Sequence, residues 1–226
     1  MRPTETLRHE HSVVLLVVGA AERESASIRE RGAADRDRVG KMVDFFKGFV
    51  DLCHHAKEEK HLFPLVRERA PDAAALVDAL LAEHEEGRRH VREVGASLDA
   101  AAAGDGPAKA VAAGHLSDYA ALLRTHIEKE DNDLFVRADV ALTSDDEATL
   151  AEAFERVETE ETGAGVHEKY HAVAHELAGL PAPEEEAPPE RPKPAKARKR
   201  AVSKKPVRAR AAKRKKTTGK RTKRKR

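Results

Sequence analysis

The chain has 226 residues, of which 40% are hydrophobic and only 4% are aromatic, with no Trp. A core of Leu, Val and Ala favours a helical bundle and argues against a β-sheet protein. The net charge of +2 conceals two oppositely charged parts of the chain. Residues 191–226 hold 20 Lys and Arg with no Asp or Glu, so the first 190 residues hold the other 22 basic residues and all 40 acidic ones. The acidic body and the basic tail therefore need separate interpretations.

The cellular compartment is indicated by two features. Cys53 is the single cysteine, so an internal disulfide framework is excluded and a reducing compartment is favoured. The apolar run at residues 13–21 is too short to span a bilayer, and Glu5 and Glu10 before it argue against a signal peptide. The sequence predicts a cytoplasmic protein with no membrane span.

Four long helices are predicted, and glycine and proline mark their ends. Gly32 ends the first, Pro71 ends the second, and Pro107 suits the first turn of the fourth. Short turns between such helices make neighbours antiparallel, as in an up-down-up-down four-helix bundle. The predicted helices cover about residues 4–31, 35–70, 72–103 and 107–142.

Shorter elements are predicted after this bundle. Ser144 with Glu147 three residues later forms a capping-box signature for a fifth helix. Gly163 and Gly165 end that helix, and a last helical piece reaches residue 180. A proline-rich acidic linker and the basic tail follow, and neither can bury enough surface to fold. The predicted parts are an all-α bundle at 1–142, additional helices packing on it at 143–180, and a disordered segment at 181–226.

An internal repeat connects the two halves of the bundle. Residues 54–63 align with residues 126–135, and five identities share this register: His54/His126, Lys57/Lys129, Glu58/Glu130, Leu62/Leu134 and Phe63/Phe135. A shorter match, L-x-x-E-H, ends at His11 in one half and at His84 in the other. The chain is therefore expected to form two helical hairpins related by an approximate two-fold axis.

Helical spacing predicts where the repeated side chains point. His54 and Glu58 are four residues apart and so share one helix face. On each helix the repeated polar residues interrupt an apolar stripe, as His84 does between Leu80 and Val91. Buried carboxylates are costly unless they are paired or bind a cation. We therefore expect six residues to hold metal: His11, His54, Glu58, His84, His126 and Glu130.

The ligand types narrow the choice of metal. Six side chains are too many for one tetrahedral zinc ion, but they suit two ions that each take two His and share two bridging Glu. This mixed set in a four-helix bundle indicates non-haem diiron, with zinc or manganese as alternatives. A charged helix surface that repeats by chance would not explain why all six positions fall within apolar stripes.

These motifs also carry a family resemblance. The order E-H, H-x-x-x-E-E-x-x-L-F-P, E-H and H-x-x-x-E-x-x-x-L-F resembles the hemerythrin HHE cation-binding domain over about residues 4–138. The resemblance implies an antiparallel four-helix bundle and a diiron centre on the same six residues. It is nearer to bacterial HHE proteins, including those implicated in iron-centre repair, than to the oxygen carriers. The carriers have a second histidine on the third helix, where this chain has Arg88.

Other residues are weaker candidates. His61 is expected to face the site, in a hydrogen-bonding or packing role rather than as a ligand. Glu161 and His167 flank the glycine hinge and could cap the site, although a polar helix-turn-helix covering the end of the bundle is the favoured interpretation. His9 and His55 are expected at the surface or at its boundary, and His90 is expected to be solvated on a polar face of its helix.

The basic tail predicts a different kind of partner. Residues 191–226 resemble the tails of linker-histone-like proteins in composition, and their charges would neutralise phosphates in a sequence-independent, salt-dependent way. RNA, anionic lipid and the acidic body of the chain are competing partners. Nucleic acid is favoured because the tail has no apolar anchor for a membrane. A partner of this kind implies that the protein is cytoplasmic or associated with the nucleoid.

Three functions remain open from the sequence. The centre could bind or sense a small oxidant such as O2, NO or peroxide. It could instead belong to an enzyme that removes peroxide or NO or repairs iron centres. The third is a nucleoid-associated protein whose metal site is structural or sequesters iron. No general base or nucleophile away from the metal residues points to a reaction.

Overall fold

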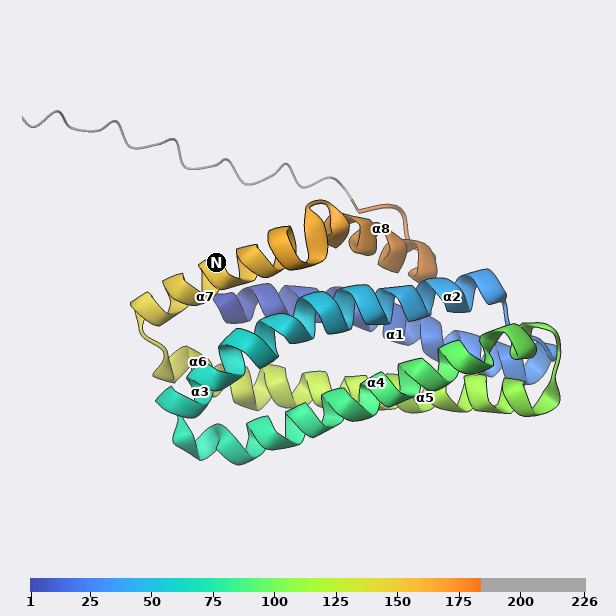
Figure 1. Cartoon of the computed structure of the whole chain (residues 1–226), viewed down its shortest axis with the longest axis horizontal. Helices are drawn as coiled ribbons and strands as arrows, with labels where there is room; N and C mark the ends of the chain where they lie inside the picture. The colour runs from blue at the N-terminus through green and yellow to red at the C-terminus, as the bar shows by residue number, and fades with distance from the viewer. Residues whose placement is uncertain (184–226) are drawn as a thin grey trace, which may run out of the picture. The chain divides into compact units, whose positions relative to one another are not determined.

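Helices alone make up the secondary structure of residues 1–183, the part of the chain that this computed structural model describes. The four principal helices are α1 (Pro3–Arg31), α2 (Arg36–Phe45), α4 (Ala74–Ala102) and α5 (Gly106–Lys129). The helix α1 packs against α2 and α5, and α4 packs against the same two helices (Figure 1). The predicted all-α four-helix bundle is confirmed. The predicted tail at 191–226 lies outside the described residues.

Two of the predicted helices are not uniform α-helices. The second continues from α2 through the π-helical segments η1 (Phe46–His55) and η2 (Glu58–Leu62) into α3 (Phe63–Arg69). The fourth continues from α5 through the π-helical η4 (Glu130–Leu134) into α6 (Phe135–Ala141). A π-helix bonds residue i to residue i+5, so each turn is wider than in an α-helix, and such segments are common at functional sites. Here η2 begins at Glu58 and η4 begins at Glu130.

The core consists of two apolar clusters with a polar layer between them. One cluster contains Val14 and Val50 together with residues of α4 and α5. The other contains Leu7 and Leu62 together with Phe63, Leu134 and Phe135. Along each helix the predicted metal residues lie between these two groups. The apolar clusters supply the hydrophobic stabilisation of the bundle, and they keep water from both faces of the polar layer.

The additional helices cover one side of the bundle. These are α7 (Ser144–Arg156), the π-helical η5 (Val157–Gly163) and α8 (Val166–Ala178), which contact α1 and η1 (Figure 1). The capping box of α7 uses Thr143 and Asp146, not the predicted Ser144 and Glu147. The N-cap residue is therefore Thr143, one position before the predicted Ser144.

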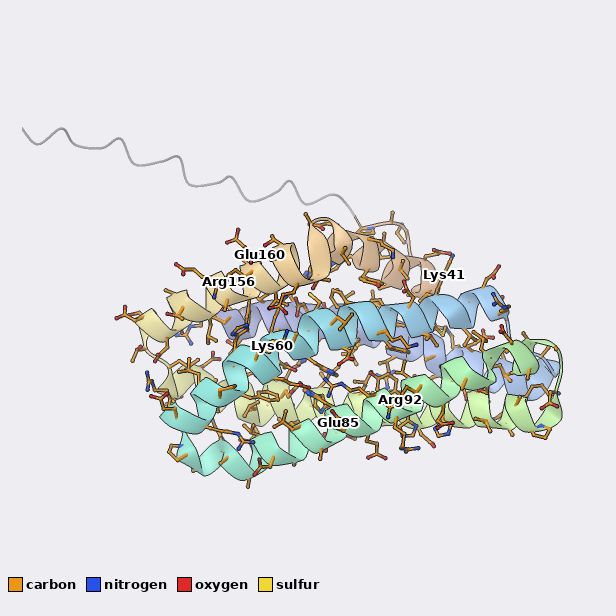
Figure 2. The ribbon with its side chains drawn as sticks, viewed as in Figure 1. Lys41, Lys60, Glu85, Arg92, Arg156 and Glu160 are labelled. Atoms are coloured by element: carbon orange, nitrogen blue, oxygen red, sulfur yellow. The ribbon has the colours of Figure 1, made fainter. Side chains whose placement is uncertain are left out.

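Charged side chains cover the outside of the bundle. The six labelled in Figure 2 are exposed: Lys41, Lys60, Glu85, Arg92, Arg156 and Glu160. No helix within residues 1–183 combines the length and the apolar character needed to cross a membrane. The polar residues of the central layer thus stand apart from the charged surface.

Candidate metal centre

Four buried imidazoles are held in the polar layer by carboxylates behind them. Each of the four predicted histidines is at most 2% exposed, and each directs Nδ1 to a carboxylate oxygen on another helix. An Nδ1–H that donates to a carboxylate leaves Nε2 as a lone-pair ligand and fixes the ring. The pairs are His11 with Asp131 at 2.8 Å, His54 with Glu10 at 2.8 Å, His84 with Glu59 at 2.7 Å and His126 with Glu83 at 2.9 Å.

These supporting carboxylates follow the internal two-fold. Glu10 and Glu83 occupy equivalent positions in the L-x-x-E-H motif, and Glu59 aligns with Asp131. Both Glu59 and Asp131 are half-buried, and each contacts a histidine of a neighbouring helix. The role of these carboxylates depends on the histidine of the neighbouring helix, so it cannot be predicted from residue spacing along one helix.

The free imidazole nitrogens converge in pairs. Nε2 of His11 lies 3.0 Å from Nε2 of His54, and Nε2 of His84 lies 3.1 Å from Nε2 of His126. When Nδ1 carries the proton on all four rings, these contacts place two lone pairs face to face. Such an arrangement is unfavourable unless a proton or a cation lies between the nitrogens.

Two carboxylates complete the layer without hydrogen bonds. Glu58 and Glu130 are fully buried, and none of their four oxygens has a hydrogen-bond partner among the described residues. The nearest imidazole Nε2 atoms are 3.2–3.6 Å from these oxygens. Burial and the neighbouring Glu130 raise the pKa of Glu58, whereas His126 and His11 hold the pKa of Glu130 low against the effect of burial. Unbonded buried carboxylates of this kind are stabilised by a cation.

The residues therefore fit a pair of metal ions. Two groups each bring four ligand atoms within 4.8 Å of one another, and Glu58 belongs to both. One group is His11, His54, Glu58 and Glu130, and the other is His55, Glu58, His84 and His126. A carboxylate shared by two groups of imidazoles is the ligand arrangement of a bridged dinuclear site.

His55 is buried in this layer, contrary to the surface position predicted for it. It is 3% exposed, its ring stacks on that of His84 with centroids 3.7 Å apart, and its Nδ1 has no hydrogen-bond partner among the described residues. The prediction assumed the rotation of an α-helix, but His55 lies in η1, whose wider turns rotate successive residues by less. The equivalent residue of the second half is Ile127, which is 5% exposed, so this apolar counterpart was the one signal in the repeat that the position is buried.

Phenylalanine rings close the layer on the side of the second apolar cluster. Phe135 stacks on His11 with centroids 5.5 Å apart, and Phe63 stacks on His84 at 5.8 Å. These two phenylalanines are equivalent in the repeat, which explains why the L-F pair recurs after each glutamate. The stacking restricts ring rotation and excludes water from the imidazoles.

The supporting ion pairs differ between the two halves. Lys57 is fully buried and pairs with Glu10 and Glu158, whereas its equivalent Lys129 is 42% exposed and pairs with Glu83. The predicted weak ligand His167 contacts Glu10 at 3.3 Å. It lies behind His54 and does not reach the six-residue layer. The Lys57 ammonium occupies the space among these groups, so they form an ion-pair network.

Two other weak candidates lie away from the layer. Glu161 is exposed and pairs with Lys60 on the surface, and His61 is half-buried beside a shallow depression between η2 and α7. The wide turn of η2 and the path of η5 along the outside of the bundle direct both side chains away from the imidazoles.

The predicted solvated position of His90 is wrong. His90 is 4% exposed, and its Nδ1 lies 2.9 Å from Nδ1 of His115 on α5. His9, by contrast, is exposed as expected. The histidine pair lies outside the six-residue layer, and Asp118 completes a partly exposed group around it.

Comparison with known proteins agrees with this geometry. The family model of the hemerythrin HHE cation-binding domain matches residues 2–138. Uncharacterised proteins of Mycobacterium bovis and Mycobacterium tuberculosis are 24% identical over 151 residues, which is 67% of this chain and 59% of each relative. The chain thus spans well under two thirds of the length of these relatives. No solved structure matches it significantly. The chain belongs to the hemerythrin HHE cation-binding family.

Proposed function

We propose that this protein holds two iron ions in the polar layer and binds or senses a small oxidant, O2, NO or peroxide, at them. The observation that carries the proposal is the convergence of four imidazole Nε2 atoms and four unbonded carboxylate oxygens in one buried layer. The proposed ligands are His11, His54, Glu58, His84, His126 and Glu130. Iron would supply open coordination positions and one-electron redox chemistry for such a ligand.

The set of ligand types favours iron or manganese over zinc. Six side chains, two of them carboxylates, are more than one tetrahedral zinc ion takes, and a mixture of imidazoles and carboxylates in a helical bundle suits a pair of iron or manganese ions.

The surrounding residues have supporting roles in this proposal. Glu10, Glu59, Glu83 and Asp131 accept the Nδ1 protons and so keep each Nε2 available to a metal. Burial lowers the pKa of His54 to about 4 against the opposing effect of Glu10, whereas, against the effect of burial, Glu130 raises the pKa of His126 to about 9. A cation bound in the layer would therefore replace the proton that His126 holds in its absence. Phe63 and Phe135 exclude bulk water from the same rings.

Metal analysis of the purified chain tests this proposal. We expect about two iron ions per chain at full occupancy, and stoichiometric, reversible spectral changes on addition of O2 or NO. A single ion per chain, or zinc alone, would contradict the dinuclear iron site. Steady turnover of peroxide or NO in place of reversible binding would assign the centre to an enzyme instead of a sensor.

We also propose that residues 191–226 bind nucleic acid, in the cytoplasm or at the nucleoid. The support is the sequence, in which 20 basic residues occur with no acidic residue. Deleting residues 185–226 is expected to abolish a mobility shift of duplex DNA that weakens steeply with salt, because the counterion release would be lost. Metal content should be unchanged, since the six proposed ligands lie in the compact unit 1–184. Equal DNA affinity after the deletion would disprove this role.

A further inference from the structure

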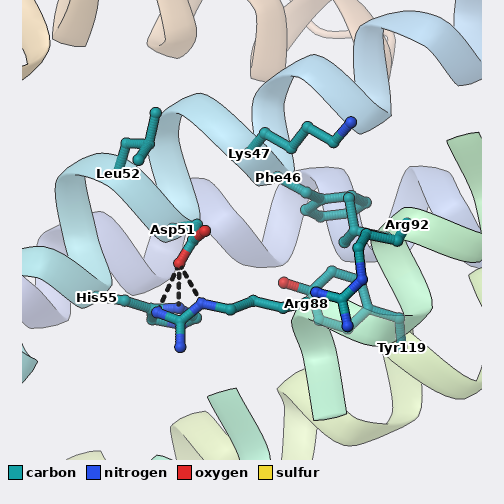
Figure 3. A pocket seen from close by; sticks show the side chains of 9 residues that line it. Phe46, Lys47, Asp51, Leu52, His55, Arg88, Arg92 and Tyr119 are labelled. Carbon is teal, nitrogen blue, oxygen red and sulfur yellow. Dashed lines mark hydrogen bonds and ion pairs between the residues drawn. The ribbon is translucent and has the colours of Figure 1, made fainter. Parts of the chain in front are cut away.

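A cavity of about 310 Å³ lies between η1 and α4, beside the polar layer (Figure 3). Its apolar wall includes Phe46 and Val91, which are 2% and 6% exposed, and Leu52 lies at its rim with 62% of its surface exposed. A volume near 300 Å³ is at the small end of the range for pockets that bind small molecules. The cavity can therefore admit one small ligand with an apolar body.

The shape of the cavity is fixed by close packing. Tyr119 packs edge-on against Phe46 with ring centroids 4.8 Å apart. A Cβ at Gly87 would lie 2.7 Å from Cε2 of Tyr119, so only glycine at this position leaves room for the ring. The cavity is thus a built feature of the bundle and not a gap that side chains would readily fill.

Two of the cations that line the cavity are free to meet a ligand. Arg88 is already satisfied by Asp51, Glu59 and Glu85, at 2.6–2.8 Å. Lys47 and Arg92 also line the cavity, and neither forms an ion pair with any residue in the part of the chain that the structure describes. The carboxylates around Arg88 offset its charge, so Lys47 and Arg92 are the two uncompensated cations of the lining. An anion would therefore be attracted to the mouth of the cavity.

The inner wall connects the cavity to the candidate metal centre. His55 lines the cavity and also belongs to the group formed with Glu58, His84 and His126. Its Nδ1 has no hydrogen bond within residues 1–183, and Asp51 is 3.8 Å away. A ligand in the cavity would contact an imidazole that itself stacks on a proposed metal ligand.

We propose that this cavity binds a small organic monoanion, a carboxylate with an apolar body. The carboxylate meets Lys47 and Arg92, and the apolar body packs between Phe46, Val91 and Leu52. The location beside a metal pair rests on the proposed function. Binding itself depends only on the cavity residues, so its measurement and metal analysis can fail independently.

The test compares two probes of one shape on the full chain. Benzoate is the anionic probe and benzamide is its neutral counterpart, and binding is followed by chemical-shift changes at Val91 and Tyr119. We expect saturable benzoate binding and about tenfold weaker benzamide binding, the effect of losing favourable contacts with two exposed cations. Equal affinity for the two probes, or no saturable shift with benzoate, would overturn the proposal.

Matched charge variants locate the site. Lys47→Gln with Arg92→Gln should weaken benzoate binding about tenfold, whereas Lys41→Gln with Arg156→Gln removes the same charge from other exposed positions and should leave it unchanged. If both pairs of substitutions weakened benzoate binding equally, the effect would depend only on the net charge of the protein, and the proposed site would be disproved. Thermal unfolding and metal content, measured in parallel, should match the parent chain because all four side chains are exposed.

An inorganic anion serves as the last comparison. Inorganic phosphate should compete with benzoate weakly, because it gains nothing from the apolar wall. Phosphate binding as tight as that of benzoate, lost in the same Lys47 and Arg92 variants, would contradict a ligand with an apolar body.

Discussion

Glu58→Ala is expected to reduce the metal content of the chain from about two ions to at most about one, with the remaining ion bound weakly. Glu58 is the residue common to both ligand groups, and its two oxygens face an imidazole Nε2 of each half. Glu59→Ala removes the hydrogen bond behind His84 and should weaken metal binding about 10- to 100-fold without abolishing it. Metal titration followed by mass spectrometry measures both effects.

Two residues of the same types provide controls for this prediction. His61→Ala and Glu161→Ala remove an imidazole and a carboxylate that lie outside the polar layer, so both variants should bind metal as the parent does. Full metal content in Glu58→Ala, or equal losses in His61→Ala, would be incompatible with the proposed ligands.

Chelation gives a second readout for the same variant. A metal that binds only the folded state stabilises it by about 2.7 kcal/mol when its free concentration is 100 times Kd. Removing the metal should therefore lower the unfolding temperature of the parent chain. Glu58→Ala should respond little to the chelator, because it has little bound metal to lose.

Lys57→Met is expected to lower the free energy of unfolding by about 3–5 kcal/mol, the usual cost of removing one partner from a buried ion pair. Lys57 is fully buried and Glu10 is 1% exposed in the pair. Burial alone would lower the pKa of Lys57, but Glu10 and Glu158 raise it, so the ammonium is charged at neutral pH. Methionine nearly preserves the volume, so the loss reports the charge. Urea unfolding at a fixed metal content measures it.

The second half of the molecule supplies the matched control. Lys129 pairs with Glu83 in the equivalent position, but 42% of its side chain is exposed, so Lys129→Met should cost about 1 kcal/mol or less. Adding Glu10→Gln to Lys57→Met should recover part of the stability, because it removes the uncompensated carboxylate. Equal costs for the two lysines would show that burial does not distinguish the pairs.

The sequence by itself determined the helical bundle and the six-residue layer. Spacing of four residues puts His54 with Glu58 and His126 with Glu130 on one face each, and the internal repeat put both faces at the same level of the bundle. Apolar residues on either side of each position showed that the face was internal. These signals are local or recur at a fixed interval, so they can be read without knowing how the helices pack.

Only the tertiary structure decided the surroundings of that layer. The roles of Glu59 and Asp131 depend on imidazoles of other helices, and that of Lys57 depends on the cover provided by η5. The burial of His55 depends on its packing against α4, where its ring stacks on that of His84, a contact that the spacing of residues along one helix does not reveal. Contacts between helices are set by their relative rotation and register. Those quantities arise from packing the whole bundle and are not encoded in the periodicity of any one helix.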